Sequence, residues 1–314
     1  MKKLSFILLA LLVCPAYATV YDLDVAMNNV RMACSGINSK MDHLKLMAGI
    51  NTGIGAVGTV TGAVALGTGI AKEKVDQDYE TLKAKIAEKI KADTNPEVHY
   101  LVDRDKFYKQ IDDFLKSHTD KVKDVKTEST KLKELEDKSK TLGNVRTGML
   151  AANTATSVAG AVISSQNKTT GSIKEAIDKC MSATDDLRES MMQARMDGQD
   201  TTIAKRIVDA CSEYKSADLS KIDKLATGST VSSSIGAVAG GVGMITSIAA
   251  NTDSTRKDDS KDGKAKEKNL NTASNVLSGV TTATSAVSTV LNGVQIATIK
   301  KVVSISEKCE KEIQ

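Results

Sequence analysis

The sequence predicts an all-α protein, an elongated bundle of long antiparallel helices with coiled-coil-like packing. Four long uncharged stretches carry apolar residues at alternating steps of three and four, which is the spacing of a helix that packs along one face. The 314 residues include only two prolines, as expected where helices run without interruption. Aromatic residues make up 3% and tryptophan is absent, so the core must be built from aliphatic and small side chains.

The clearest of these stretches covers residues 225–251, and similar stretches cover 46–71, 147–166 and 269–299. Serine, threonine and asparagine fall largely opposite the apolar positions. We therefore expect the apolar residues to form the contacts between helices in a water-soluble bundle, with the polar face in solvent. In the stretch at residues 225–251, the apolar positions are Val231, Ile235, Val238, Val242, Ile245 and Ala249.

Glycines accompany the apolar positions and remove side-chain bulk where another helix could approach closely. Glycines four residues apart are also typical of helix packing in membranes, and each stretch is long enough to cross a bilayer. A membrane role is therefore possible, although the abundant polar residues favour water. The candidate packing glycines are Gly49, Gly53, Gly58, Gly62, Gly236, Gly240 and Gly243.

Residues 1–18 have the features of a secretory signal peptide. Lys2 and Lys3 form a positive start, residues 4–13 an apolar core, and residues 16–18 (Ala-Tyr-Ala) a small-x-small cleavage site. The short start is typical of bacterial export. We expect a periplasmic or extracellular protein.

Export places the remaining cysteines in a compartment that permits disulfides. The mature chain keeps four of them, Cys34, Cys180, Cys211 and Cys309. Their positions predict the pairs Cys34–Cys180 and Cys211–Cys309, each closing one helical hairpin. The pairing of Cys34 with Cys211 and of Cys180 with Cys309 stays open, because sequence does not fix connectivity.

The hairpins are predicted from an internal duplication. Ala33-Cys34-Ser35 corresponds to Ala210-Cys211-Ser212, and three further blocks and a final cysteine follow in the same order in both copies. We expect a first hairpin at residues 19–198 and a second, shorter one at 199–314.

The first hairpin is expected to carry a protruding, two-stranded, charged coiled-coil arm over residues 72–140. A first helix is predicted from about residue 38 to 91. Residues 95–97 (Asn-Pro-Glu) have the pattern of a helix start, and a single return helix is expected to follow. The arm is the predicted surface for a protein partner or for self-association.

The sequence offers no recognisable catalytic, cofactor-binding or metal-binding arrangement. His43, His99 and His118 have no paired spacing, and no phosphate-binding loop or nucleophile motif occurs. The 43 basic and 39 acidic residues are mixed along the chain and give a net charge of +4, which argues against a nucleic-acid surface.

We therefore expect an exported, non-enzymatic helical scaffold or protein-interaction protein. The alternative is a membrane-active protein that inserts a glycine-rich helical hairpin, either to form a pore or to associate with the cell envelope.

Overall fold

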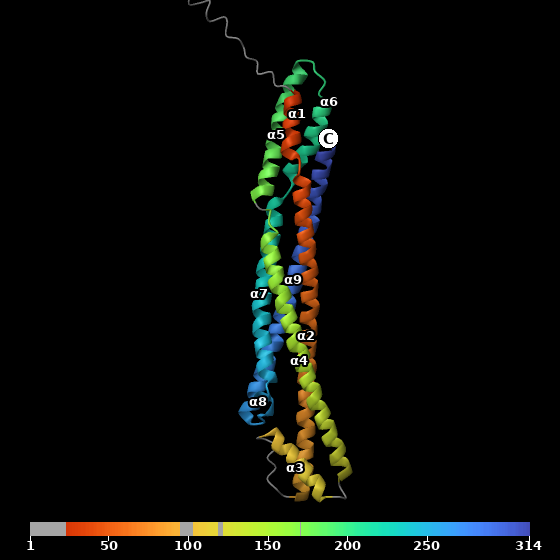
Figure 1. The fold of residues 1–314 in the computed structure, drawn as a ribbon, viewed down its shortest axis with the longest axis vertical. Helices are drawn as coiled ribbons and strands as arrows, with labels where there is room; N and C mark the ends of the chain where they lie inside the picture. The colour runs from red at the N-terminus through yellow and green to blue at the C-terminus, as the bar shows by residue number, and fades with distance from the viewer. Residues whose placement is uncertain (1–22, 95–102, 119–121, 170) are drawn as a thin grey trace, which may run out of the picture. The chain divides into compact units, whose positions relative to one another are not determined.

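The computed structural model describes residues 23–94, 103–118, 122–169 and 171–314, and these form the all-α fold that the sequence predicts (Figure 1). Among them there is no strand, only an isolated bridge between Asp103 and Asp258. The predicted signal peptide, the predicted helix start at residues 95–97 and His99 lie outside the described residues.

Positive backbone φ angles at Gly36 and Gly198 mark two of the breaks between helices, where a side chain would be strained. The helix predicted from about residue 38 is present as α2. The described helices, with one short 3-10 helix η1, are α1 (Leu23–Cys34), α2 (Ile37–Thr94), α3 (Arg104–Ser117), α4 (Val122–Gln166), α5 (Gly171–Met196), α6 (Thr202–Cys211), η1 (Ser212–Ser216), α7 (Leu219–Asn251), α8 (Asp253–Lys257) and α9 (Lys261–Ile313).

The chain divides into two compact units. Of the described residues, unit 1 contains 23–45, 169, 171–222 and 297–314, and unit 2 contains 46–94, 103–118, 122–168 and 223–296. This division crosses α2, α7 and α9 and separates segments within each sequence copy. The boundary predicted near Gly198 separates two sequence copies and not two compact units. It stays a prediction.

Unit 1 has a conventional apolar core, with Val30, Met41 and Leu187 fully buried. Its four cysteines form the predicted disulfides, Cys34–Cys180 and Cys211–Cys309. The predicted connectivity is thus confirmed, and the alternative pairing is not present. Paired cysteines are typical of an oxidising, non-cytoplasmic compartment.

Unit 2 packs α2, α4, α7 and α9 into an antiparallel four-helix bundle (Figure 1). The close approaches define the register: Gly55 faces Thr289 and Gly62 faces Thr282, so α2 and α9 run in opposite directions. Gly62 also faces Asn153 of α4. Gly236 of α7 lies against both α4 and α9, which completes the ring of four neighbouring pairs.

The predicted two-stranded arm is wrong in one respect. The return segment does not form a single helix, because α3 ends at Ser117 and α4 begins at Val122. The apolar face of α3 packs with α2 and α4, and a third helix therefore fills the core there. That core contains Tyr79, Ile86, Ala87, Ile90, Phe107, Ile111, Phe114, Val125 and Leu132.

Candidate functional site

The outer surface of the four-helix bundle in unit 2 is apolar. This overturns the expected packing, in which the apolar residues lay between the helices. Val238 and Ile245 of α7, expected in the interior, are 68% and 63% exposed. We call the exposed large apolar residues of the four helices the apolar belt. Its members are Leu46, Ile50, Val57, Val60, Val64, Ile70, Val145, Val158, Val162, Val231, Ile235, Val238, Val242, Ile245, Ile248, Val276, Val280, Val287, Val290 and Val294.

The interior of the same bundle is lined by small and polar residues, which we call the polar seam. On α9 the seam follows steps of four and three, the spacing that places one residue per turn against neighbouring helices. Every one of these α9 positions is buried. They are Ser274, Ser278, Thr281, Ser285, Ser288, Asn292 and Gln295.

Hydrogen bonds across the polar seam join all four helices at one level. Asn51 of α2 donates to Ser164 of α4 and, at 3.4 Å, to Ser229 of α7. The Ser164 and Ser229 hydroxyls are 2.9 Å apart, and Ser229 lies 2.8 Å from Ser288 of α9. These side chains are fully or almost fully buried, so each hydrogen bond replaces a lost contact with water.

The polar seam continues toward both ends of the bundle. Ser247 of α7 lies 2.8 Å from Thr147 of α4, and Ser274 donates to the Gly243 carbonyl. At the opposite end, Gln295 donates to the backbone carbonyl of Asn167 at 2.9 Å. Buried polar side chains thus occur along the length of the uncharged stretches, with Leu150 as a large apolar residue among them.

Five of the seven candidate packing glycines lie where another helix approaches. A Cβ atom on Gly62 would come 2.5 Å from Asn153 Nδ2 and 3.1 Å from the backbone Cα of Thr282. Gly58, Gly236, Gly240 and Gly243 are similarly close to neighbouring helices. Gly49 and Gly53 face open space, with no atom within 4 Å of such a Cβ.

This inversion is confined to the uncharged stretches of the chain. Unit 1 buries apolar side chains, and so does the three-helix packing around Phe107. Both obey the ordinary preference for apolar interiors. The same chain therefore contains two conventional cores and one inverted bundle.

The apolar belt has the dimensions of a bilayer core. Its members extend over residues 46–70 of α2 and 231–248 of α7, which correspond to about 36 Å and 26 Å of helix. A hydrocarbon core is about 30 Å thick. Two helical stretches, Leu23–Ala92 and Thr202–Asn251, contain windows apolar and long enough to cross a membrane. Only 28% and 39% of these windows are buried, whereas a soluble core helix is mostly buried.

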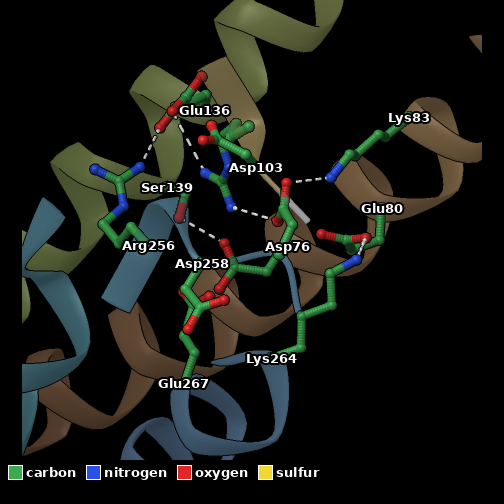
Figure 2. A network of polar contacts seen from close by, with 12 residues as sticks. Asp76, Glu80, Lys83, Asp103, Glu136, Ser139, Arg256, Asp258, Lys264 and Glu267 are labelled. Atoms are coloured by element: carbon green, nitrogen blue, oxygen red, sulfur yellow. Dashed lines mark hydrogen bonds and ion pairs between the residues drawn. The ribbon is translucent and has the colours of Figure 1, made fainter. Parts of the chain in front are cut away.

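Beyond the belt lies the charged end of unit 2, formed by residues 72–94, 103–118, 122–140 and 252–268. Lys83 of α2 pairs with Asp259 just before α9, and both side chains are 1% exposed. Arg104 of α3 lies 3.3 Å from Glu136 and 3.7 Å from Asp259. Figure 2 also shows Arg256 directed at Glu136, where it donates to the backbone carbonyl at 3.2 Å. The network ties α8 and the start of α9 to α2, α3 and α4.

A cleft of about 550 Å³ opens beside this network, lined by residues of α2, α3, α4 and α9. Glu267 lines it, and burial raises the pKa of its carboxyl despite Lys72 at 3.4 Å. Across the network, burial lowers the pKa of Lys83 against the opposing effect of Asp259. The buried cations Lys72, Lys83 and Arg104 each have a carboxylate within 4 Å, an arrangement that holds helices together.

Known proteins offer no guide to this arrangement. The chain matches no protein-family model, no curated protein and no solved structure. Its function must be inferred from the geometry alone.

The described histidines form no site together. His43 is exposed on α2. His118 ends α3, with its ring stacked on Phe114 at 4.5 Å between centroids. Sequence reasoning missed the polar seam, although a signal was present: the buried polar residues of α9 repeat with the same spacing as the apolar ones.

Proposed function

We propose that this chain is an exported, non-enzymatic protein that acts at a lipid bilayer, with the four-helix bundle of unit 2 embedded in the membrane. The apolar belt carries the proposal. Twenty large apolar side chains on four helices face outward while the polar seam is buried. That distribution suits a bundle surrounded by hydrocarbon.

Water is an unfavourable surrounding for such a surface. Burying a valine or isoleucine side chain is worth roughly 1.5–3 kcal/mol, and the belt surrounds the bundle instead of forming a single patch. In hydrocarbon the apolar belt no longer bears the free-energy cost of exposure to water. Hydrogen bonds between serine and asparagine side chains then hold the helices together. Both requirements are met by the same four helices.

A second candidate function is binding of a protein partner, or self-association, through the arm at residues 72–140. The cleft at the charged end supports it, because it is open to solvent and lined by both carboxylates and amines. A partner could bind there whether or not the bundle lies in a membrane. A soluble scaffold would additionally need other protein chains to cover the apolar belt.

Flotation of the purified protein with liposomes of phosphatidylcholine and phosphatidylglycerol tests the membrane proposal. We expect the protein to float with the lipid at high salt, because burial of apolar surface is insensitive to ionic strength. The double variant Val238→Asp, Ile245→Asp should remain in the soluble fraction. Ile203→Asp is the matched control, since Ile203 is 55% exposed but lies in unit 1, and it should float like the unaltered protein.

Measurement of the protein's oligomeric state in the absence of lipid completes the test. If the protein fails to float and instead forms a stable oligomer that Val238→Asp disrupts, the belt is a protein interface and the membrane proposal fails. Leakage of a trapped dye distinguishes a pore from an embedded bundle that leaves the bilayer sealed.

A further inference from the structure

The two disulfides of unit 1 lie against each other. The sulfurs of Cys34, Cys211 and Cys309 are all within 4.8 Å of one another, although they come from both disulfides. The sulfur of Cys180 is bonded to that of Cys34 and so lies next to this group of three, without being within 4.8 Å of all its members. All four cysteines are buried, with at most 1% of any residue exposed.

This spacing is close to what a tetrathiolate metal site requires. Zinc binds cysteine sulfur at about 2.3 Å in tetrahedral geometry, which places the four sulfurs about 3.8 Å apart. Three of the sulfurs are within 4.8 Å of one another and the fourth, on Cys180, is bonded to one of them, so rotation of the side chains freed by reduction would bring the four together. The four residues come from four different helices, α1, α5, α6 and α9, so a bound ion would join segments that the disulfides join only in pairs.

We propose that, when its disulfides are reduced, unit 1 binds one thiophilic divalent cation of the Zn²⁺ class through Cys34, Cys180, Cys211 and Cys309. The oxidised chain has two disulfides at this place, and the reduced chain has a metal centre. The proposal does not depend on the bilayer function of unit 2.

Reduction of the two disulfides consumes four electrons and four protons and gives four thiols; a phosphine reductant supplies the electrons and is itself oxidised. Zn²⁺ then binds the four thiolates and releases the four thiol protons, so affinity rises with pH. Oxidation of the four thiolates by molecular oxygen, which accepts their four electrons and four protons from solvent and is reduced to two water molecules, restores the two disulfides and releases the ion.

Titration of the reduced protein with Cd²⁺ under anaerobic conditions tests the proposal. The protein carries Cys14→Ser, which removes the fifth thiol of the chain. We expect one Cd²⁺ per chain, an ultraviolet sulfur-to-metal charge-transfer band, and release of previously bound Zn²⁺ as Cd²⁺ is added, because the softer ion binds thiolates more tightly. The thermal midpoint of the reduced protein should rise when the metal is added, because a ligand of the folded state stabilises it.

Two variants provide the comparison. Cys180→Ser leaves three thiols after reduction and should bind Cd²⁺ at least about tenfold more weakly, the change that corresponds to about 1.4 kcal/mol. The variant with all four cysteines replaced by serine should show no charge-transfer band. The proposal is overturned if the reduced protein takes up no Cd²⁺, or if Cys180→Ser binds as tightly as its parent. It is equally overturned if the reduced protein loses helix by circular dichroism and Zn²⁺ does not restore it.

Discussion

The hydroxyls of Ser229 on α7 and Ser288 on α9 lie 2.8 Å apart in the interior of the unit 2 bundle, where a soluble four-helix protein would place leucine or valine. Both side chains are buried, whereas the neighbouring Val231, Ile235, Val287 and Val290 on the same helices are exposed. The contact places hydrogen bonding at the centre of this bundle and its apolar surface at the periphery.

The polar seam should behave as one coupled network. Asn51→Ala should lower the free energy of unfolding by about 1–3 kcal/mol, because it leaves buried hydroxyls of Ser164 and Ser229 with fewer partners. Combined with Ser229→Ala, the two effects should be non-additive by at least about 0.5 kcal/mol. Denaturation in lipid or detergent measures both. Ser234→Ala, on an exposed hydroxyl that bonds within its own helix, should change stability by less than about 0.5 kcal/mol.

Two glycines of α2 should respond to alanine in opposite directions. Gly53→Ala should stabilise the protein by roughly 0.5–1 kcal/mol, since the added methyl meets no atom and alanine favours the helix. Gly62→Ala should destabilise it by about 1–3 kcal/mol, because the methyl collides with Asn153 and the Thr282 backbone. Thermal unfolding of the pair compares them directly, and equal shifts would contradict the close packing of α2 against α4 and α9.

The stability that the buried Lys83–Asp259 ion pair gives to the charged end should depend on both residues. Lys83→Met leaves the Asp259 carboxylate buried without its closest cation and should cost roughly 3–5 kcal/mol. Adding Asp259→Leu removes that charge and should recover much of the loss. A double variant as unstable as Lys83→Met alone would show that the ion pair does not hold these segments together. Urea denaturation followed by circular dichroism gives the three values.

Acid should weaken the contact between α2 and α4 at Glu128. Burial opposes ionisation of this carboxyl, but hydrogen bonds from Lys89 and Lys85, each 2.9 Å away, lower its pKa overall. The resulting stabilisation is present above the ordinary glutamate pKa of about 4.3 and is lost as pH falls through the lowered value. Glu128→Gln should therefore cost up to about 1 kcal/mol at pH 7 and nothing near pH 2–3. A cost that stays constant with pH would rule out this linkage.

Sequence periodicity predicted the helices well and their orientation poorly. Steps of three and four place Val231, Ile235 and Val238 on one face, but the same spacing on the opposite face holds Ser229, Ser233 and others. Periodicity identifies which residues share a face and leaves open whether that face meets another helix, water or lipid. Taking water as the surrounding placed the apolar face inside, opposite to its position in the structure.

The cysteine pairs were predicted from similar sequence blocks that give each cysteine a corresponding place in two proposed copies. The break between α3 and α4 was missed because neither proline nor glycine occurs there. Its signal is weaker: residues 117–120, Ser-His-Thr-Asp, include types favoured at helix ends. The Lys83–Asp259 pair joins residues 176 positions apart, a separation over which the sequence pattern carries no information.

Single-site fluorescent labels on the apolar belt test the membrane proposal most directly. In the Cys14→Ser background the native cysteines are paired, so Val60→Cys, Val158→Cys, Val238→Cys and Val290→Cys each add one free thiol for a polarity-sensitive dye, on α2, α4, α7 and α9 in turn. Ile203→Cys in unit 1 is the control. On addition of liposomes we expect a blue-shifted emission from all four belt labels, quenched by lipids with nitroxide-labelled acyl chains, and no change at residue 203. Belt labels that remain in water in the folded protein would contradict the account.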